Sequence, residues 1–435
     1  MSFEENTICA IATASGGAIG IVRVSGKDAL FNTDAIFRAI NGKSLVDAKP
    51  NTIHYGEIIN QHGEIIDDVL VAVYHAPFSY TGEDAVEIMC HGSLYILQMV
   101  VQLLCLQGCV LAQPGEYTQR AFLNGKMDLS QAEAVADLIA SSNVATHRLA
   151  ISQMRGGYSK ELRTLREQLL EMTALLELEI DFSEEDVEFA NRQQLFYLAQ
   201  KVDKKISNLV ESFRLGNVLK NGIPVAIIGQ PNVGKSTLLN RLLHEDKALV
   251  SEVRGTTRDA IEDSIFIQGI LFRFIDTAGI HTTDDVVESM GIERTLKKAQ
   301  EADVIIMMKE PGVEYPNISV SQNQYVIRVE NKTEEFQALT GIGVDELEEN
   351  LVKYAQSRQQ TDSDIIVTNV RHIEALRLAL SDIQRVEQEL TDGYTTSDII
   401  VIDLHGCINH LAEITGDITS DETLHSIFSR FCIGK

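Results

Sequence analysis

The chain carries the octapeptide GQPNVGKS at residues 229–236, directly after the apolar run Val225–Ile228 and leading into the helix-forming stretch STLLNRLL. In this strand–loop–helix order, GxxxxGK[ST] is the sequence of a phosphate-binding P-loop, and a chance match on a glycine-rich turn is the weaker alternative. The glycines let backbone N–H groups surround the phosphates, while the following helix presents its positive end to them. Lys235 supplies charge for the β- and γ-phosphates, and the Ser236 hydroxyl suits Mg²⁺.

Two further segments indicate which kind of P-loop protein this is. The run GTTRD stands at 255–259, and an apolar strand at 271–275 leads into DTAG at 276–279. A threonine of the first segment can reach Mg²⁺ when a triphosphate is bound, and Asp276 suits the outer shell of the metal. The Gly279 N–H can meet a γ-phosphate. All three motifs in this order favour a switch-type GTPase over an ATPase.

The guanine-selecting segment departs from the usual NKxD pattern. After an apolar strand at 325–329, the chain reads NKTE at 331–334, with Glu334 where an aspartate would accept hydrogen bonds from guanine. A second box, usually Ser-Ala followed by Lys, Leu or Arg, corresponds to Gln337-Ala338-Leu339 and lies unusually close to the first. We expect GTP as the nucleotide. The alternative is a surface loop that binds no ligand.

Hydrolysis needs a group other than the glutamine that Ras-like enzymes place after DxxG, because Ile280 occupies that position. Asn232 offers a side-chain oxygen for a monovalent cation near the β/γ bridge, where a cation would stabilise developing charge. Glu288 is the candidate for orienting the attacking water. Its alternative is a solvated charge on a loop.

Composition and charge argue against some classes of function. The 435 residues include 37 basic and 63 acidic side chains, a formal net charge of −26, which argues against a sequence-blind nucleic-acid coat and an anionic-membrane binder. The uncharged stretch Leu94–Ala112 carries glutamines at near-helical spacing and predicts a one-sided helix, not a membrane span. Because the first ten residues lack a basic cluster and the six cysteines form no CxxC pair, we expect a cytoplasmic protein with reduced thiols.

Three kinds of sequence pattern divide the chain into segments. Short β-rich runs (IGIVRVSG, DDVLVAVYHA and DAVEIMCHG) predict a small α+β domain over residues 1–124. Helical patterns occupy 125–215 and return over 362–435, on either side of an alternating β/α pattern at 216–361. The first helical segment carries leucines at helical spacing, which form a stripe on one face: Leu162, Leu165, Leu169 and Leu176. The expected fold is therefore multi-domain, α/β and α, with a helical domain interrupted by an inserted P-loop domain.

Longer motifs identify a resemblance that covers essentially the whole chain. They are GGAIGIVRVSG at 16–26, SYTGEDAVEIMCHG at 79–92, PGEYTQRAFLNGKMDLSQAEAVADLI at 114–139, GQPNVGKST, GTTRD, DTAG and the final FCIGK. In these the chain resembles the bacterial MnmE family, also called TrmE, of tRNA-modification GTPases. The resemblance implies an N-terminal domain that dimerises and binds a tetrahydrofolate derivative (the 5-formyl or methylene form), and a Ras-like inserted GTPase domain. It is weakest over 309–345, where the GTPase segment is short.

The resemblance also implies roles for single residues. Folate contacts fall on Arg23, Glu87, Lys126 and Lys435, although three of these, Arg23, Glu87 and Lys126, would otherwise be read as ordinary polar-face charges. Potassium ligands fall on Asn232, Ser251, Val253 and Thr256, magnesium ligands on Ser236 and Thr257, and catalytic groups on Glu288, Asn232 and Lys235. Cys432 is a possible functional thiol, with a buried thiol as the alternative. The implied nucleotide-binding set is Asn232, Val233, Gly234, Lys235, Ser236, Thr237, Ser251, Glu252, Val253, Arg254, Gly255, Thr256, Thr257, Asp276, Thr277, Ala278, Gly279, Asn331, Lys332, Glu334, Gln337, Ala338 and Leu339.

The implied activity is coupled to a partner. The family acts as a homodimer with an FAD-containing protein, MnmG, in a heterotetramer without a membrane. It adds an aminomethyl or carboxymethylaminomethyl group at carbon 5 of the wobble uridine, position 34, of certain tRNAs, using K⁺, Mg²⁺ and the folate one-carbon unit. The competing hypothesis is a GTP-switched ribosome or RNA assembly factor without one-carbon chemistry. Such a factor predicts a basic RNA-binding domain, and residues 1–124 show no basic bias.

Overall fold

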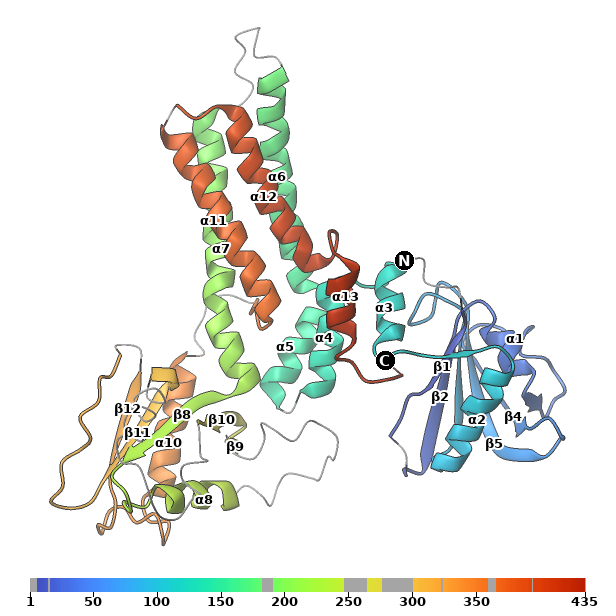
Figure 1. Ribbon diagram of the computed structural model, residues 1–435, viewed down its shortest axis with the longest axis horizontal. Helices are drawn as coiled ribbons and strands as arrows, with labels where there is room; N and C mark the ends of the chain where they lie inside the picture. The colour runs from blue at the N-terminus through green and yellow to red at the C-terminus, as the bar shows by residue number, and fades with distance from the viewer. Residues whose placement is uncertain are drawn as a thin grey trace. The chain divides into compact units, whose positions relative to one another are not determined.

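The computed structural model describes residues 6–14, 16–141, 143–181, 191–245, 264–275, 300–321, 324–358, 365–392 and 394–434 (Figure 1). The chain folds into two compact units. The first comprises Met1–Ala140, Ile151–Arg166 and Leu411–Lys435, and the second Ser141–Ala150 and Glu167–His410.

The first unit is built on a seven-stranded sheet in the order β3-β4-β5-β6-β2-β1-β7. Its strands are β1 Ile8–Ile11, β2 Ile19–Ser25, β3 Phe37–Ala39, β4 Thr52–Ile59, β5 Ile65–Tyr74, β6 Ala85–His91 and β7 Val110–Leu111. The β1–β7 pair is parallel and the other neighbouring pairs are antiparallel. The three β-rich runs predicted from the sequence are thus confirmed as β2, β5 and β6.

One face of this sheet carries the core, because alternate side chains of a strand point to the same face. Val22, Val71 and Ile88 on that face pack with helices α1 (Ala29–Asp34) and α2 (Leu94–Leu106) in one buried cluster. The one-sided helix predicted from residue 94 onward is confirmed: Leu97, Val100 and Leu104 are buried, while Gln98 and Gln102 are exposed.

The opposite face of the sheet carries an apolar row. Tyr55, Leu70, Met89 and Ile21 lie side by side across β4, β5, β6 and β2. Tyr55 and Leu70 are 54% and 43% exposed in the single chain, and the other two are half-buried. Singly exposed apolar residues are normal, but a row in register is the kind of patch that proteins use for association.

Helices complete the first unit. They are α3 Glu116–Leu123, α4 Leu129–Ala140, α13 Asp421–Phe428 and the start of α6. A cluster of Leu129, Leu424, Phe428 and Phe431 joins α4 to the C-terminal segment. Gly115 has φ +70°, and a Cβ there would lie 2.6 Å from the Phe428 carbonyl oxygen, so the close approach of these segments requires glycine.

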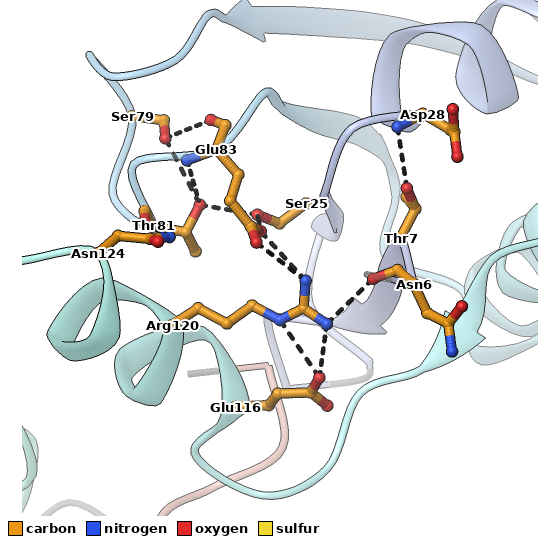
Figure 2. Close-up of polar contacts among 10 residues, drawn as sticks. All are labelled: Asn6, Thr7, Ser25, Asp28, Ser79, Thr81, Glu83, Glu116, Arg120 and Asn124. Atoms are coloured by element: carbon orange, nitrogen blue, oxygen red, sulfur yellow. Dashed lines mark hydrogen bonds and ion pairs between the residues drawn. The ribbon is translucent and has the colours of Figure 1, made fainter. Parts of the chain in front are cut away.

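A buried ion network joins α3 to the loop between β5 and β6 (Figure 2). The Arg120 guanidinium donates to Glu116 Oε1 at 2.8 Å and to Glu83 Oε1 at 3.1 Å, and it also donates to the Asn6 carbonyl. Only 8% of the Arg120 side chain is exposed. Ser25 donates to Glu83 at 2.7 Å, which extends the network to β2. Such charges are stable when buried because each has an opposite charge and further hydrogen bonds.

The second unit contains long helices. They are α5 Val144–Met154 and α6 Gly157–Asp181 (both shared with the first unit), α7 Arg192–Asn221, α11 Val370–Asp392 and α12 Ser397–Thr415. Asn191 begins α7 by accepting the Gln193 N–H at 2.9 Å. The leucine stripe predicted for α6 is confirmed, because all four of its members are at most 1% exposed. Gly216 lets α7 approach Val367: a Cβ at 216 would lie 2.0 Å from the Val367 carbonyl oxygen.

The second unit also holds a five-stranded sheet in the order β12-β11-β8-β10-β9. Its elements are β8 Ile223–Gly229, α8 Lys235–Glu245, β9 Ser264–Ile267, β10 Ile270–Phe274, β11 Val304–Lys309, β12 Tyr325–Glu330 and α10 Val344–Arg358. Strands β10, β8, β11 and β12 are parallel and β9 is antiparallel at the edge. The carboxyl ends of the parallel strands therefore meet at one edge, where ligands bind in α/β sheets.

The connection between the parallel strands β11 and β12 contains no helix over residues 310–321. Tyr315 and Ile318 pack instead on the buried cluster that contains Ile305 and Met307. Two apolar side chains of an extended segment thus provide the cover that a crossover helix usually provides.

We predict that the Arg120 network stabilises the first unit. Replacing Arg120 with alanine leaves the buried Glu116 carboxylate without its cation, so the free energy of unfolding should fall by about 3–5 kcal/mol. Urea denaturation measures this. The matched control is Arg38→Ala: Arg38 pairs with Glu57 at the surface, with 53% of its side chain exposed, and such a pair contributes about 0–1 kcal/mol. Equal losses in the two variants would contradict the prediction.

Candidate functional sites

The P-loop connects the central strand β8 to α8. Asn232 and Gly234 adopt left-handed φ values of +62° and +100°. This backbone turns residues 230–234 back toward the start of α8, as a loop that wraps phosphates must. Glycine is needed at 229 as well, because a Cβ there would lie 2.6 Å from the Met308 carbonyl oxygen on β11.

Lys235 lies across its own loop. Its Nζ donates to the carbonyl oxygens of Gly229 and Gln230, both at 2.8 Å. The ammonium group is therefore already held over the loop, at the point where a phosphate would approach the N-terminus of α8. Ser236 follows on the same helix turn. The two P-loop side chains predicted to act on phosphate and Mg²⁺ are thus brought together.

Asn331 ties three segments together. It follows β12 directly and is only 4% exposed. Its Nδ2 donates to the Val233 carbonyl at 2.7 Å, and its Oδ1 accepts the Ala338 N–H at 2.9 Å. Gly234 leaves the room that this requires, since a Cβ there would lie 2.4 Å from Asn331 Nδ2. The two boxes predicted to select guanine therefore meet the P-loop through one amide side chain.

The segment 331–343, here called the base loop, is short and bonded to itself. Gln337 N–H donates to the Ile342 carbonyl at 3.0 Å, and Gly341 N–H donates to the Gln337 carbonyl at 2.9 Å. Lys332, with φ +66°, forms an ion pair with Glu310 at 2.5 Å. Glu334 and Leu339 are exposed. These hydrogen bonds within the loop give it a defined conformation, although the two predicted guanine-selecting boxes lie close together in the sequence.

Several predicted site residues lie outside the described residues. They are Ser251, Glu252, Val253, Arg254, Gly255, Thr256, Thr257, Asp276, Thr277, Ala278, Gly279, Glu288 and Lys435. Within the described part of the chain, no group of three His, Cys, Asp or Glu side chains is arranged to hold a metal ion.

The first unit contains a cavity of about 220 Å³ on the sheet face that carries Arg23. Arg23 Nη2 and Nε both donate to Glu87 Oε1, at 2.7 and 3.0 Å. The two residues face each other across β2 and β6. Both side chains are between 20 and 25% exposed, so the pair remains reachable for a ligand. The remaining lining residues are Ser25, Tyr74, Tyr80, Thr81, Ala85 and Tyr117.

Three tyrosines form much of the cavity wall, and sequence reasoning missed all of them. The Arg23 guanidinium lies 5.8 Å from the Tyr80 ring and 5.6 Å from the Tyr117 ring, within cation–π range. Burial raises the pKa of all three hydroxyls, and for Tyr74 the neighbouring Glu87 charge raises it further. The tyrosines therefore stay neutral and can donate hydrogen bonds. They come from β5, the following loop and α3, so no local spacing could reveal them.

The C-terminal segment reaches this cavity. Arg23 Nη1 donates to the Gly434 carbonyl at 3.2 Å, and a Cβ at Gly434, φ +90°, would lie 2.5 Å from the Ile11 carbonyl oxygen. Cys432 is exposed, so the alternative of a buried thiol is wrong. Lys126 does not line the cavity; its Nζ donates to the Pro77 carbonyl at 2.8 Å, and its chain lies beside Gly82.

Comparison with known proteins decides the family. Residues 7–126 match the profile "GTP-binding protein TrmE N-terminus", and residues 129–432 match the "MnmE helical domain". The chain is 52% identical to the tRNA modification GTPase MnmE of Bacteroides fragilis, with 99% of this chain and 100% of that protein covered. The chain belongs to the MnmE family of tRNA modification GTPases. The predicted enzyme class, a GTPase that serves tRNA modification, is confirmed by this membership.

Other MnmE relatives agree. The protein of Bacteroides thetaiotaomicron is 53% identical, with 99% of this chain and 100% of that protein covered. That of Porphyromonas gingivalis is 46% identical, with 100% and 99% covered. The alignment with the Bacteroides fragilis MnmE runs over 466 positions, more than the 435 residues of this chain, so that relative has residues with no counterpart here.

A solved structure offers a weaker likeness. The cytosolic domain of the T. maritima FeoB iron transporter covers 46% of this chain and 100% of that domain at 17% identity, with a TM-score of 0.21, too low to carry an argument. Across the described helices, none is both long and apolar enough for a bilayer crossing.

The Asn331 amide gives the first test of this site. In Asn331→Ala the Val233 carbonyl and the Ala338 N–H both lose their partner, so we expect GDP affinity to fall about 10–100-fold. Titration of a fluorescent GDP analogue measures the dissociation constant. Asn208→Ala, at an exposed position of α7, should leave it unchanged. An Asn331→Ala protein that binds GDP as tightly as the parent would show that the amide does not organise the site.

Proposed function

We propose that this chain is a K⁺-activated GTPase that acts with an FAD-dependent partner on the wobble uridine of certain tRNAs. The two would install an aminomethyl or carboxymethylaminomethyl group at carbon 5, with a tetrahydrofolate one-carbon unit as the carbon source. The observation that carries this proposal is the cavity around Arg23 and Glu87 in the TrmE-type domain. An RNA assembly factor without one-carbon chemistry has no use for such a site, and family membership also favours the modification enzyme.

The phosphate end of GTP would be bound by the P-loop. Backbone N–H groups of 232–236 and the Lys235 ammonium would contact the β- and γ-phosphates, and Ser236, with Thr257, would hold Mg²⁺. Asn232 offers its side-chain oxygen to K⁺, together with Ser251, Val253 and Thr256. When bound, the potassium ion supplies positive charge at the β/γ bridge, where charge develops in the transition state. Glu288 would orient the attacking water.

The base end would be bound by the base loop. Asn331 holds the loop against Val233 and, by accepting the Ala338 N–H, fixes the second box beside the first. Glu334 would accept from guanine N1–H and N2–H, as an aspartate does in the usual pattern. Glu334 is exposed, which leaves its longer side chain free to adjust to the base.

The cavity chemistry suits a reduced folate. Folate carries a pterin edge with N–H donors, which a carboxylate such as Glu87 can accept, and a glutamate tail, which cations bind. Arg23 is the cation of the cavity itself, and Lys126 and Lys435 are the further cations that the family resemblance implies; Lys126 would have to leave the Pro77 carbonyl to contact the ligand. The Tyr80 ring, which is 40% exposed, adds flat apolar surface for the pterin.

The assembly would be a cytoplasmic homodimer. The apolar row of Tyr55, Leu70, Met89 and Ile21 on the first unit offers a self-complementary surface for the second copy. The acidic net charge leaves most phosphate contacts of the tRNA to the partner, with exposed lysines of α7, such as Lys201 and Lys204, as local contacts. Residues 1–124 would form the folate-binding and dimerisation domain, with the GTPase domain at 216–361 inserted between helical parts 125–215 and 362–435.

GTP hydrolysis should depend on the alkali cation. We expect the steady-state rate of the purified chain with GTP to be at least about tenfold higher in KCl than in NaCl, because only K⁺ matches the proposed ligand set. Glu288→Ala should lower turnover by about 100-fold or more with little change in GTP affinity. Equal rates in the two salts would remove the cation mechanism, and a large loss of affinity in Glu288→Ala would remove its catalytic role.

Reduced folate should bind to the first unit. We expect the intact chain to bind labelled 5-formyltetrahydrofolate, and Arg23→Ala to weaken that binding about 10–100-fold through loss of a charged hydrogen bond. Equilibrium dialysis measures both values, with Arg38→Ala as the matched surface control. No detectable binding by the parent chain at high micromolar ligand would favour the assembly-factor hypothesis instead.

A further inference from the structure

Two side-chain hydrogen bonds connect the base loop to the P-loop and to α8. The first is made by Asn331, buried at the end of β12. The second is made by Arg241 of α8, whose Nη2 donates to the Thr340 carbonyl at 3.0 Å. The two contacts fix opposite ends of the same short loop, because Asn331 begins it and Thr340 lies just after the predicted base-contacting residues.

Local packing shows that the Arg241 contact is built into the fold. Gly341 has φ +90°, and a Cβ there would lie 2.3 Å from Arg241 Nη2 and 2.9 Å from its Cζ. The guanidinium therefore rests directly against the backbone of the base loop at Gly341, where the left-handed φ favours glycine. Arg241 is half-buried, so its side chain is partly fixed by its surroundings.

The helix that carries Arg241 also carries the phosphate-binding residues. Lys235 and Ser236 stand at the start of α8, and Arg241 lies six residues after Lys235 on the same helix. At 1.5 Å per residue, six residues span about 9 Å along the helix axis. A guanine nucleotide must be held at its phosphates and at its base at the same time. A rigid helix that contacts both the P-loop and the base loop sets the distance between the two.

We propose that Arg241 is a positioning residue for guanine selection. It holds residues 339–341 at the correct distance from the P-loop, so that the second box and the Glu334 carboxylate meet the base together. This inference rests on the proposed guanine site. It adds to that site a residue that lies outside every nucleotide-binding motif in the sequence.

The experiment compares GDP and ADP binding by the intact chain and three variants, with fluorescent analogues of both nucleotides. In Arg241→Ala we expect the dissociation constant for GDP to rise about tenfold, the loss expected for one hydrogen bond, while the constant for ADP stays unchanged. Arg241→Lys keeps a donor for the Thr340 carbonyl and should lie between. Asn240→Ala is the matched control, because Asn240 is the exposed neighbouring position on the same helix.

The ratio of the two dissociation constants separates positioning from stability. A purely structural role would lower the melting temperature and weaken GDP and ADP equally, which would overturn the inference. If the parent chain prefers GDP to ADP and the Arg241→Ala variant prefers it to the same degree, the role of Arg241 is overturned as well. The proposed guanine site is then still supported. A parent chain that binds GDP and ADP alike would overturn the guanine site itself and the role of Arg241 with it.

Discussion

The side-chain amide of Asn331 is the contact on which the nucleotide site depends. One buried group donates to the P-loop at Val233 and accepts from the base loop at Ala338. A buried amide left without one of these partners costs about 1–3 kcal/mol, so the two loops are stable together and unstable apart. This link matters more here than in a GTPase with longer connections, because the base loop contains only residues 331–343 between β12 and α10.

In the first unit, ion pairs connect distant segments in a similar way. Arg120 is buried between Glu83 and Glu116, and Glu83 is in turn bonded to Ser25, which lines the cavity. Arg23 pairs with Glu87 at the other side of that cavity and also contacts the backbone of Gly434. A ligand that binds Arg23 therefore meets a side chain whose partners come from β6 and from the C-terminal segment. The site is organised before any ligand arrives, which reduces the entropy lost on binding.

The sequence predicted what is encoded locally. The P-loop, the leucine stripe of α6 and the strands β2, β5 and β6 follow from periodicity and turn residues within short windows. The contacts of Asn331 with Val233 and with Ala338 were within reach too, because the motifs name these residues. The cavity tyrosines, the Arg120 network and the Arg241 contact were not, since each joins residues far apart in the chain.

The central claim is that a shortened base loop, held by Asn331, still selects guanine. The most direct measurement is the steady-state hydrolysis of GTP and of ATP by the purified chain at equal concentrations, with Mg²⁺ and KCl present. We predict phosphate release from GTP and almost none from ATP. Equal rates with the two nucleotides would contradict it, because a phosphate site without a working base site would treat them alike.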